Sequence, residues 1–393
     1  MRLTPAVVFG LVLLGASGLA TAQVLDVSPF VLATLEHDSN LLRSRADAPG
    51  GPNRRSDTVS RLALGVTAEF NPGLQQARLT GIYKPVWYRH FDQFDHDAYE
   101  LDARWDWVAG RRFDGRLGVT AEREIDDFAN RSAPEAGFVR RQGIGALGAY
   151  NLSPRWRLEA EARHDRRMGS GAADPGFDLR ESVAVAGLFY QGHRIARLGV
   201  SATLTEGRFP QRVAGAGLAT EYEQTSVDGQ IVWAPSALSE LDGTIGYTQR
   251  QQQPTSTRNY EGLTGRLAYR RRVSAKTRLS LLGYRRIYSA ELQDANLTVD
   301  DGLRLEMDWS WSYKTQLRGA IEHRDVEFEA AGALAGAATQ LREEIDLVSL
   351  TLAWQALERL GLRLVAEHES RTSSEPSRDY DAGVARLEIR LGF

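Results

Sequence analysis

Histidine, serine and carboxylate side chains are the groups in this sequence that could carry out hydrolysis. A lipase-type site needs a serine and a histidine with a polar group that orients the ring, and an aspartate-dependent protease needs an Asp–His arrangement. None of the seven histidines falls in a catalytic motif of either kind. His193 lies in a predicted short turn, and His323 and His368 lie near strand ends, so we interpret them as surface residues. The full set is His37, His90, His96, His164, His193, His323 and His368.

Three acidic segments could bind Ca²⁺ through oxygen ligands, namely 37–40, Asp126-Asp127 and Asp300-Asp301. None has the spacing of an EF-hand loop, and Asx side chains at strand ends commonly bond to the local backbone. The chain has no cysteine, which excludes disulfides and thiolate metal sites. We therefore predict no catalytic residue, no metal and no cofactor, and we expect that the protein is not an enzyme.

The composition describes a folded, exported chain. Of the 393 residues, 42% are hydrophobic and 25% are charged, with a net charge of -3, which argues against disorder and against nucleic-acid binding. Residues 1–22 have a positive start at Arg2, an apolar run over 7–14 and an Ala20-Thr21-Ala22 cleavage signal. We predict a cleavable signal peptide over 1–22 and one domain over 23–393.

Apolar and charged residues alternate along most of the mature chain. In the last eight residues, 386–393, the aliphatic side chains and the terminal Phe393 alternate with Arg386, Glu388 and Arg390. Period-two alternation is typical of strands with two different faces. After residue 22 no apolar stretch reaches the roughly 18 residues that a spanning helix requires. Only a closed barrel can then cross a membrane, because lipid offers no partners to open backbone groups.

Long polar connections and short turns alternate between these strands. This pattern is typical of outer-membrane barrels, which have long external loops and short periplasmic turns. We predict an all-β fold, a transmembrane antiparallel up-and-down β-barrel of about 18 strands, with 16 as the alternative count. We expect it in the bacterial outer membrane with both termini in the periplasm. Its expected partners are outer-membrane lipid, lipopolysaccharide and, through Phe393, the machinery that inserts barrels.

The register that places aliphatic residues toward lipid places charged residues in the interior. A barrel of this size is wide enough for an aqueous channel. The charges could stabilise neighbouring strands as ion pairs, or they could select solutes, and the two roles are compatible. The predicted pore-lining residues are Arg61, Arg78, Lys84, Glu100, Asp102, Arg104, Asp106, Arg116, Glu122, Arg157, Glu159, Glu161, Arg163, Arg266, Arg278, Arg304, Glu306, Asp308, Arg363, Glu367, Arg386, Glu388 and Arg390.

The N-terminal strand carries a short motif. Pro29-Phe30-Val31 is followed by Asp38-Ser39-Asn40-Leu41-Leu42-Arg43, and an aromatic-rich run follows between Tyr83 and Tyr99. This arrangement resembles a β-barrel porin family associated with exopolysaccharide biosynthesis and export (EpsL-like proteins), whose motif is carried here by Asp38, Asn40 and Leu41. Leu42 departs from the pattern, because the family usually has an aromatic residue there. The resemblance implies a channel that assists the export of an exopolysaccharide, with the polymer and periplasmic export proteins as partners.

Two other functions stay open. The first alternative is a general diffusion porin for small hydrophilic solutes, and the second is a barrel-type hydrolase of lipids. Single-channel conductance separates the first from an export channel, since polysaccharide fragments should block only the latter.

Overall fold

The computed structural model describes residues 25–45, 54–126, 128–130, 137–170, 178–192, 195–212, 218–254, 259–289, 295–330 and 341–393. The predicted signal peptide lies outside these residues. Eighteen strands form the structure, and each is long enough to cross a membrane when tilted. They are β1 (Leu25–Asp38), β2 (Asp57–Phe70), β3 (Gln76–Tyr88), β4 (His96–Ala109), β5 (Phe113–Ile125), β6 (Phe138–Asn151), β7 (Trp156–Ser170), β8 (Leu179–Tyr190), β9 (Ile195–Arg208), β10 (Glu221–Ser236), β11 (Ser239–Gln253), β12 (Tyr260–Arg272), β13 (Thr277–Ser289), β14 (Ala295–Ser310), β15 (Thr315–Ala330), β16 (Leu341–Leu357), β17 (Leu360–Ser373) and β18 (Tyr380–Gly392).

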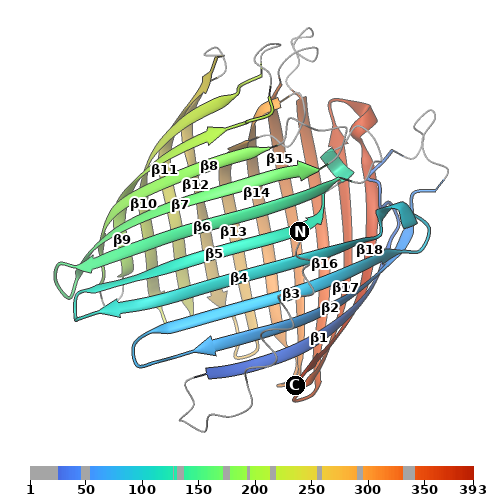
Figure 1. Cartoon of the computed structure of the whole chain (residues 1–393), viewed down its shortest axis with the longest axis horizontal. Helices are drawn as coiled ribbons and strands as arrows, with labels where there is room; N and C mark the ends of the chain where they lie inside the picture. Colours follow the sequence, from blue (N-terminus) through green and yellow to red (C-terminus); the bar gives the residue numbers. More distant parts are fainter. Residues whose placement is uncertain are drawn as a thin grey trace, which may run out of the picture.

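The strands form one closed antiparallel sheet. Each strand pairs with its neighbours in sequence, and β18 pairs with β1 from Phe30 opposite Gly392 to Asp38 opposite Val384. The result is a tilted barrel (Figure 1). The predicted fold and the count of 18 strands are therefore confirmed, and the alternative count of 16 is not needed. No helix in the described part of the chain is long and apolar enough to span a membrane.

The two ends of the barrel differ in the length of their connections. At one end the connections are short, from as few residues as 237–238 up to residues 71–75. At the other end they are longer, from residues 290–294 up to residues 39–56. The first strand begins and the last strand ends at the short-turn end (Figure 1). There the backbone N–H of Phe393 donates to the carbonyl of Pro29 at 3.0 Å, while its side chain stays exposed.

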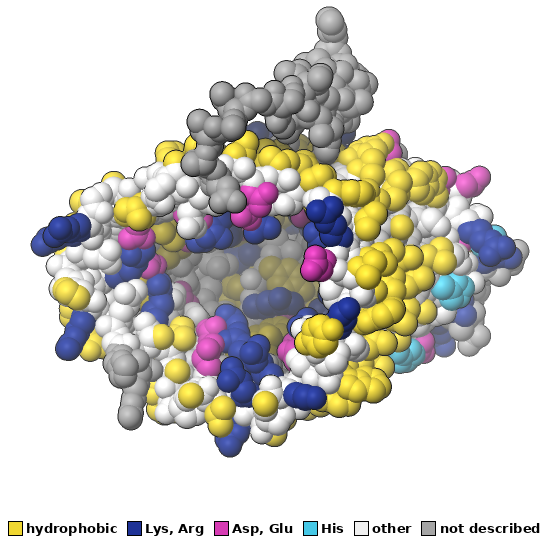
Figure 2. All heavy atoms as spheres, turned by 90° about the horizontal axis from the view of Figure 1, so that it is seen from below, with side chains coloured by type: hydrophobic (Ala, Val, Ile, Leu, Met, Phe, Trp, Pro, Cys, Tyr) yellow, Lys and Arg dark blue, Asp and Glu magenta, His cyan; other side chains and the backbone are white. Residues whose placement is uncertain are grey.

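The outer surface of the barrel is an apolar belt. Large side chains such as Ile144, Leu204, Ile245 and Leu350 are at least half exposed, which a water-soluble protein would avoid over so wide an area. Seen from the short-turn end, hydrophobic side chains cover the outside, and charged side chains surround the hollow interior (Figure 2). Aromatic pairs such as Phe113–Tyr150 and Trp156–Tyr190 lie near the short turns, as in the aromatic girdle of a membrane barrel.

Candidate functional site

The pairing register carries one face of the sheet from strand to strand, because directly opposite residues point to the same side. Following that face from Glu388 through Thr34 and Arg61 brings every predicted lining residue onto the inner wall. The residues concerned are Arg61, Arg78, Lys84, Glu100, Asp102, Arg104, Asp106, Arg116, Glu122, Arg157, Glu159, Glu161, Arg163, Arg266, Arg278, Arg304, Glu306, Asp308, Arg363, Glu367, Arg386, Glu388 and Arg390.

Most of these inner charges take part in ion pairs along the wall. Arg157 bonds to Asp114 on β5, and Glu159 accepts from Arg197 on β9 at 2.7 Å. On the other side of the barrel, Arg304 bonds to Glu322 at 2.9 Å. These side chains are part-buried but still reach the barrel interior, and ion pairs that water can reach contribute little to stability individually. Their main effect is to hold the side chains against the wall and to neutralise them there.

A smaller set of inner charges is available to solutes. Among the described residues, Arg278 and Arg324 form no ion pair, and the same holds for Asp102 and Glu161. Asp102 contributes to a recess of about 380 Å³ on β4–β8, whose lining also includes Glu100, Glu122 and Arg141. The wall therefore presents unpaired groups of both signs to the barrel interior.

Connections at the long end fold inward and pack on the wall. Phe94, in the β3–β4 connection, is fully buried against Val59 and Tyr88 of the inner face. Its ring also meets that of Phe128, in the short 3₁₀ helix η2 (Phe128–Asn130) of the β5–β6 connection, with ring centroids 4.9 Å apart. Leu41, from the β1–β2 connection, joins the same cluster. This apolar group covers the inner wall of β2 and β3 at that end.

The β5–β6 connection also contacts β17, which lies on the other side of the pairing between β1 and β18. Arg371 on β17 donates from Nη1 to the carbonyl oxygen of Ala129 in η2 at 2.8 Å, although the residues are 242 positions apart. Glu343 on β16 holds Arg371 at 3.4 Å and Arg378 of the β17–β18 connection at 2.5 Å. The Glu343 side chain is almost fully buried. Arg371 therefore clamps the β5–β6 connection over the lumen.

A second inward group lies on β8–β14. Arg212, in the β9–β10 connection, donates to the carbonyl of Ala295 at 3.3 Å, and the backbone N–H of Ala219 donates to the side chain of Asn296 at 2.8 Å. Burial, together with repulsion from Arg250, lowers the pKa of Arg212 to about 10. Both contacts join the β9–β10 connection to β14, four strands away around the wall from β10.

The inner wall beneath this connection is tightly packed. The Arg250 guanidinium stacks over the Tyr222 ring at 3.4 Å, and the Tyr222 hydroxyl donates to Glu181. Tyr222 can lie flat only because its neighbour is Gly207, where a Cβ would come within 2.0 Å of the ring. The lumen is thus narrowed from two sides at the long-connection end.

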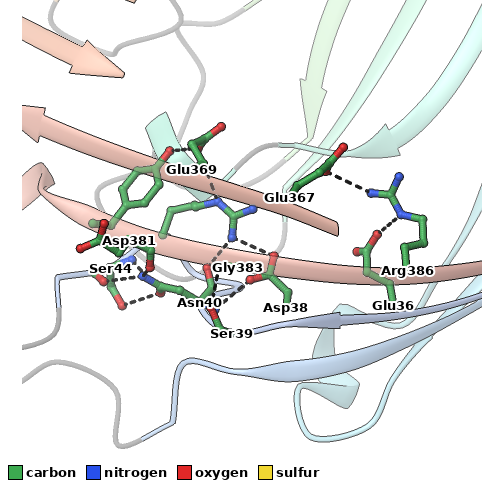
Figure 3. Close-up of polar contacts among 12 residues, drawn as sticks. Glu36, Asp38, Ser39, Asn40, Ser44, Glu367, Glu369, Asp381, Gly383 and Arg386 are labelled. Atoms are coloured by element: carbon green, nitrogen blue, oxygen red, sulfur yellow. Dashed lines mark hydrogen bonds and ion pairs between the residues drawn. The ribbon is translucent and has the colours of Figure 1, made fainter. Parts of the chain in front are cut away.

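The Asp38–Leu41 motif lies at the join between β1 and β18 (Figure 3). Asn40 donates from Nδ2 to the carbonyls of Ser44 at 2.8 Å and Asp381 at 3.0 Å, and its own N–H donates to Asp38 at 2.8 Å. Nearby, Ser39 exchanges hydrogen bonds with the backbone of Gly383. Together with Leu41 in the apolar cluster, these contacts close the barrel and turn the β1–β2 connection inward. The motif is therefore structural.

The histidines do not assemble a hydrolytic site in the described part of the chain. His164 Nδ1 lies 2.9 Å from the hydroxyl of Ser182, but its Nε2 accepts a hydrogen bond from Arg166 at 3.2 Å. The ring proton must then sit on Nδ1, so His164 cannot remove a proton from Ser182. His323 and His368 lie on the outer face, as predicted, and His323 bonds to Asp346. His193 lies outside the described residues.

The predicted acidic segments are used locally. Asp300 and Asp301 point to opposite faces and bind Arg286 and Arg285, respectively, while Asp127 lies outside the described residues. Within the described ranges, no three His, Asp or Glu side chains are arranged to hold a metal ion.

Comparison with solved structures places this fold among outer-membrane barrels. The structure of OccK1 (OpdK) from Pseudomonas aeruginosa matches over 94% of this chain and 99% of that one, with a TM-score of 0.54 and 12% identity. OccK2 (OpdF) from the same organism, in complex with glucuronate, matches over 94% and 98%, with a TM-score of 0.51 and 13% identity. OpdK is described as an outer membrane protein. No protein-family model matches the chain, and no curated protein matches it either.

The resemblance to exopolysaccharide-associated proteins is wrong. The solved structures named above are outer-membrane proteins of the Occ and Opd type, and no exopolysaccharide family model matches. The physical reason is that Asp38, Asn40 and Leu41 serve barrel closure, which says nothing about the transported molecule. Such a short motif therefore cannot carry a function.

The inward packing of the long connections was not predicted from the sequence. A signal was present in Phe91, Phe94 and Phe128, because connections that stay in water have no need for three phenylalanines. Their packing partners could not be identified from sequence, since Tyr88, Leu41 and Phe128 come from three separate segments.

Proposed function

We propose that the protein is a passive diffusion channel of the outer membrane for small hydrophilic solutes. The observation that carries this proposal is a closed barrel whose inner wall is charged and whose lumen is narrowed by its own connections. A water-filled path with paired charges suits small polar molecules, and the narrowing opposes the passage of large polymers. In this proposal the long connections face the cell exterior and both termini face the periplasm.

We further propose that small carboxylates are among the solutes. The guanidinium groups of Arg278 and Arg324 have no carboxylate partner among the described residues, and arginine binds carboxylates through paired hydrogen bonds. The similar barrels OccK2 and OpdK were crystallised with glucuronate and vanillate. Both of these ligands carry a carboxylate.

Planar-bilayer recording of the purified barrel tests the channel. We expect steady single-channel conductance in KCl, and we expect millimolar glucuronate to interrupt the current more often than an equal concentration of glucose. In the double variant Arg278→Gln/Arg324→Gln the difference between glucuronate and glucose should shrink. A folded barrel that conducts no ions would contradict the channel itself. Equal block by glucose and glucuronate in the unmodified protein would contradict only the carboxylate preference.

A further inference from the structure

Five arginines form a row on the outer face of the barrel, close to the long connections. They are Arg123 on β5, Arg140 on β6, Arg166 on β7, Arg180 on β8 and Arg208 on β9, and we name them the outer arginine row. Successive side chains of a strand point to opposite faces, and each of these arginines is adjacent in sequence to an inward-facing residue, as Arg140 is to Arg141 and Arg166 is to Asp165. The five arginines therefore point outward. The apolar belt begins within a few residues, at Val119, Ile144 and Leu204.

Like charges face each other along this row. Arg123 lies opposite Arg140, Arg166 opposite Arg180, and Arg180 opposite Arg208. Directly opposed like charges destabilise a sheet. The outward positions of these five strands in the described ranges hold only one carboxylate, Glu206. Within the described ranges, these five strands therefore leave most of the charge of the row without compensation.

The contacts of the row are mostly uncharged. Arg123 donates to the carbonyl of Asp97 at 2.9 Å, Arg166 donates to His164, and Arg208 lies 3.8 Å from Glu221. Arg140 and Arg180 are exposed and have no acidic partner among the described residues. Both guanidinium groups are free to bind an external anion.

The opposite side of the same rim behaves differently. There Arg285 bonds to Asp301 at 3.1 Å, His323 bonds to Asp346 at 2.7 Å, and Arg342 pairs with Glu327. Each basic group on that side lies across from an acid, and Asp325 opposite Glu344 makes the side acidic overall. The uncompensated positive charge is thus a property of β5–β9 and not of the rim as a whole.

We propose that the outer arginine row binds the phosphate groups of a phosphorylated glycolipid, the lipopolysaccharide of the outer leaflet. Five adjacent strands span roughly 20 Å along the membrane surface, enough for several phosphates. Guanidinium groups bind phosphate through paired hydrogen bonds, and the acyl chains of the same molecule would lie on the apolar belt below. This inference rests on the proposed outward orientation of the long connections, but not on the proposed solutes.

A second copy of the chain is a poorer occupant. The acidic side of the rim, on β14–β16, could attract the outer arginine row of a neighbour. The two sectors, centred on β7 and β15, lie nearly opposite each other in an 18-stranded barrel. Pairing them would build open rows of barrels instead of a closed ring.

Binding of lipid A to the purified barrel tests the proposal. The probe is bisphosphorylated lipid A, and binding is measured by native mass spectrometry and by titration in detergent. We expect the double variant Arg140→Gln/Arg180→Gln to bind at least tenfold more weakly than the unmodified protein. The matched control, Arg285→Gln/Arg342→Gln, removes the same number of arginines from the same rim and should bind as the unmodified protein does.

Three results would overturn the proposal. The first is equal loss of binding in the two double variants, and the second is equal binding of lipid A from which both phosphates have been removed. The third is displacement of lipid A by inorganic phosphate at equal concentration, which would indicate a small-anion site. Single-channel conductance of the Arg140→Gln/Arg180→Gln protein should be unchanged. That readout separates failure of this proposal from failure of the proposed channel.

Discussion

Glu36 shows how one inner carboxylate joins the two ends of the chain. It accepts hydrogen bonds from Arg61 on β2 at 2.9 Å and from Arg386 on β18 at 2.6 Å, and its side chain is only 7% exposed. These contacts span the join between β1 and β18 (Figure 3). A buried carboxylate is tolerated there because two arginines compensate its charge.

We expect Glu36→Gln to weaken the join. The neutral amide would remove the negative charge that Arg61 and Arg386 share, and both arginines would stay half-buried. This should lower the free energy of unfolding by about 3 kcal/mol. The temperature at which the barrel unfolds in detergent, followed by circular dichroism, measures the loss. Glu306→Gln is the control, because Glu306 also contacts two arginines but is more exposed. An equal loss in both variants would contradict the role of Glu36.

At the scale of elements, the inward connections decide how much of the barrel interior stays open at the long-connection end. The β5–β6 connection is held by apolar packing around Phe94 and by a hydrogen bond from Arg371. Apolar packing limits how far a connection can move, whereas the hydrogen bond fixes where its backbone lies. The two contributions can therefore be separated by substitution.

We expect Arg371→Ala to release the β5–β6 connection while the barrel stays closed. Loss of a buried hydrogen bond should lower the free energy needed to open this connection by about 1–3 kcal/mol. Amide exchange at residues 128–130 should then become faster, by on the order of tenfold or more. Single-channel conductance should rise, because the clamp over the lumen is gone. Arg363→Ala is the matched control on the same strand and face, and its conductance should change less. Unchanged exchange and conductance in Arg371→Ala would refute the clamp.

At the scale of the whole molecule, the two faces of the sheet meet different solvents. Leu350 on β16 is half exposed on the outer belt, and its neighbour Ser349 faces the lumen opposite Glu367. A charge in the middle of the outer face must enter hydrocarbon, while a charge on the inner face meets water and a carboxylate. Adjacent residues therefore differ sharply in what they tolerate.

We expect Leu350→Arg to destabilise the barrel in lipid by about 2–4 kcal/mol. Ser349→Arg should change the stability little, because Glu367 lies directly opposite and compensates the new charge. Denaturant unfolding in lipid vesicles measures both. A similar loss in the two variants would mean that the inner and outer faces have been assigned incorrectly.

Alternation with period two is a local property, and this explains what could be predicted. The faces of Arg386, Glu388 and Arg390, and of every other lining residue, follow from position along a strand once lipid is assumed on one side. The strand count followed from the spacing of the connections. The prediction failed where a short motif, Asp38–Leu41, was used to assign a function instead of a structural role.

The sequence by itself determined the barrel, its faces and its 18 strands, because each strand carries its own pattern of apolar and charged residues. Only the tertiary structure decided which side chains meet. The contact between Arg371 and Ala129 and the row from Arg123 to Arg208 depend on strand register and on curvature around the barrel. Register and curvature are set by pairing between separate segments of the chain, which the alternation within one strand cannot predict.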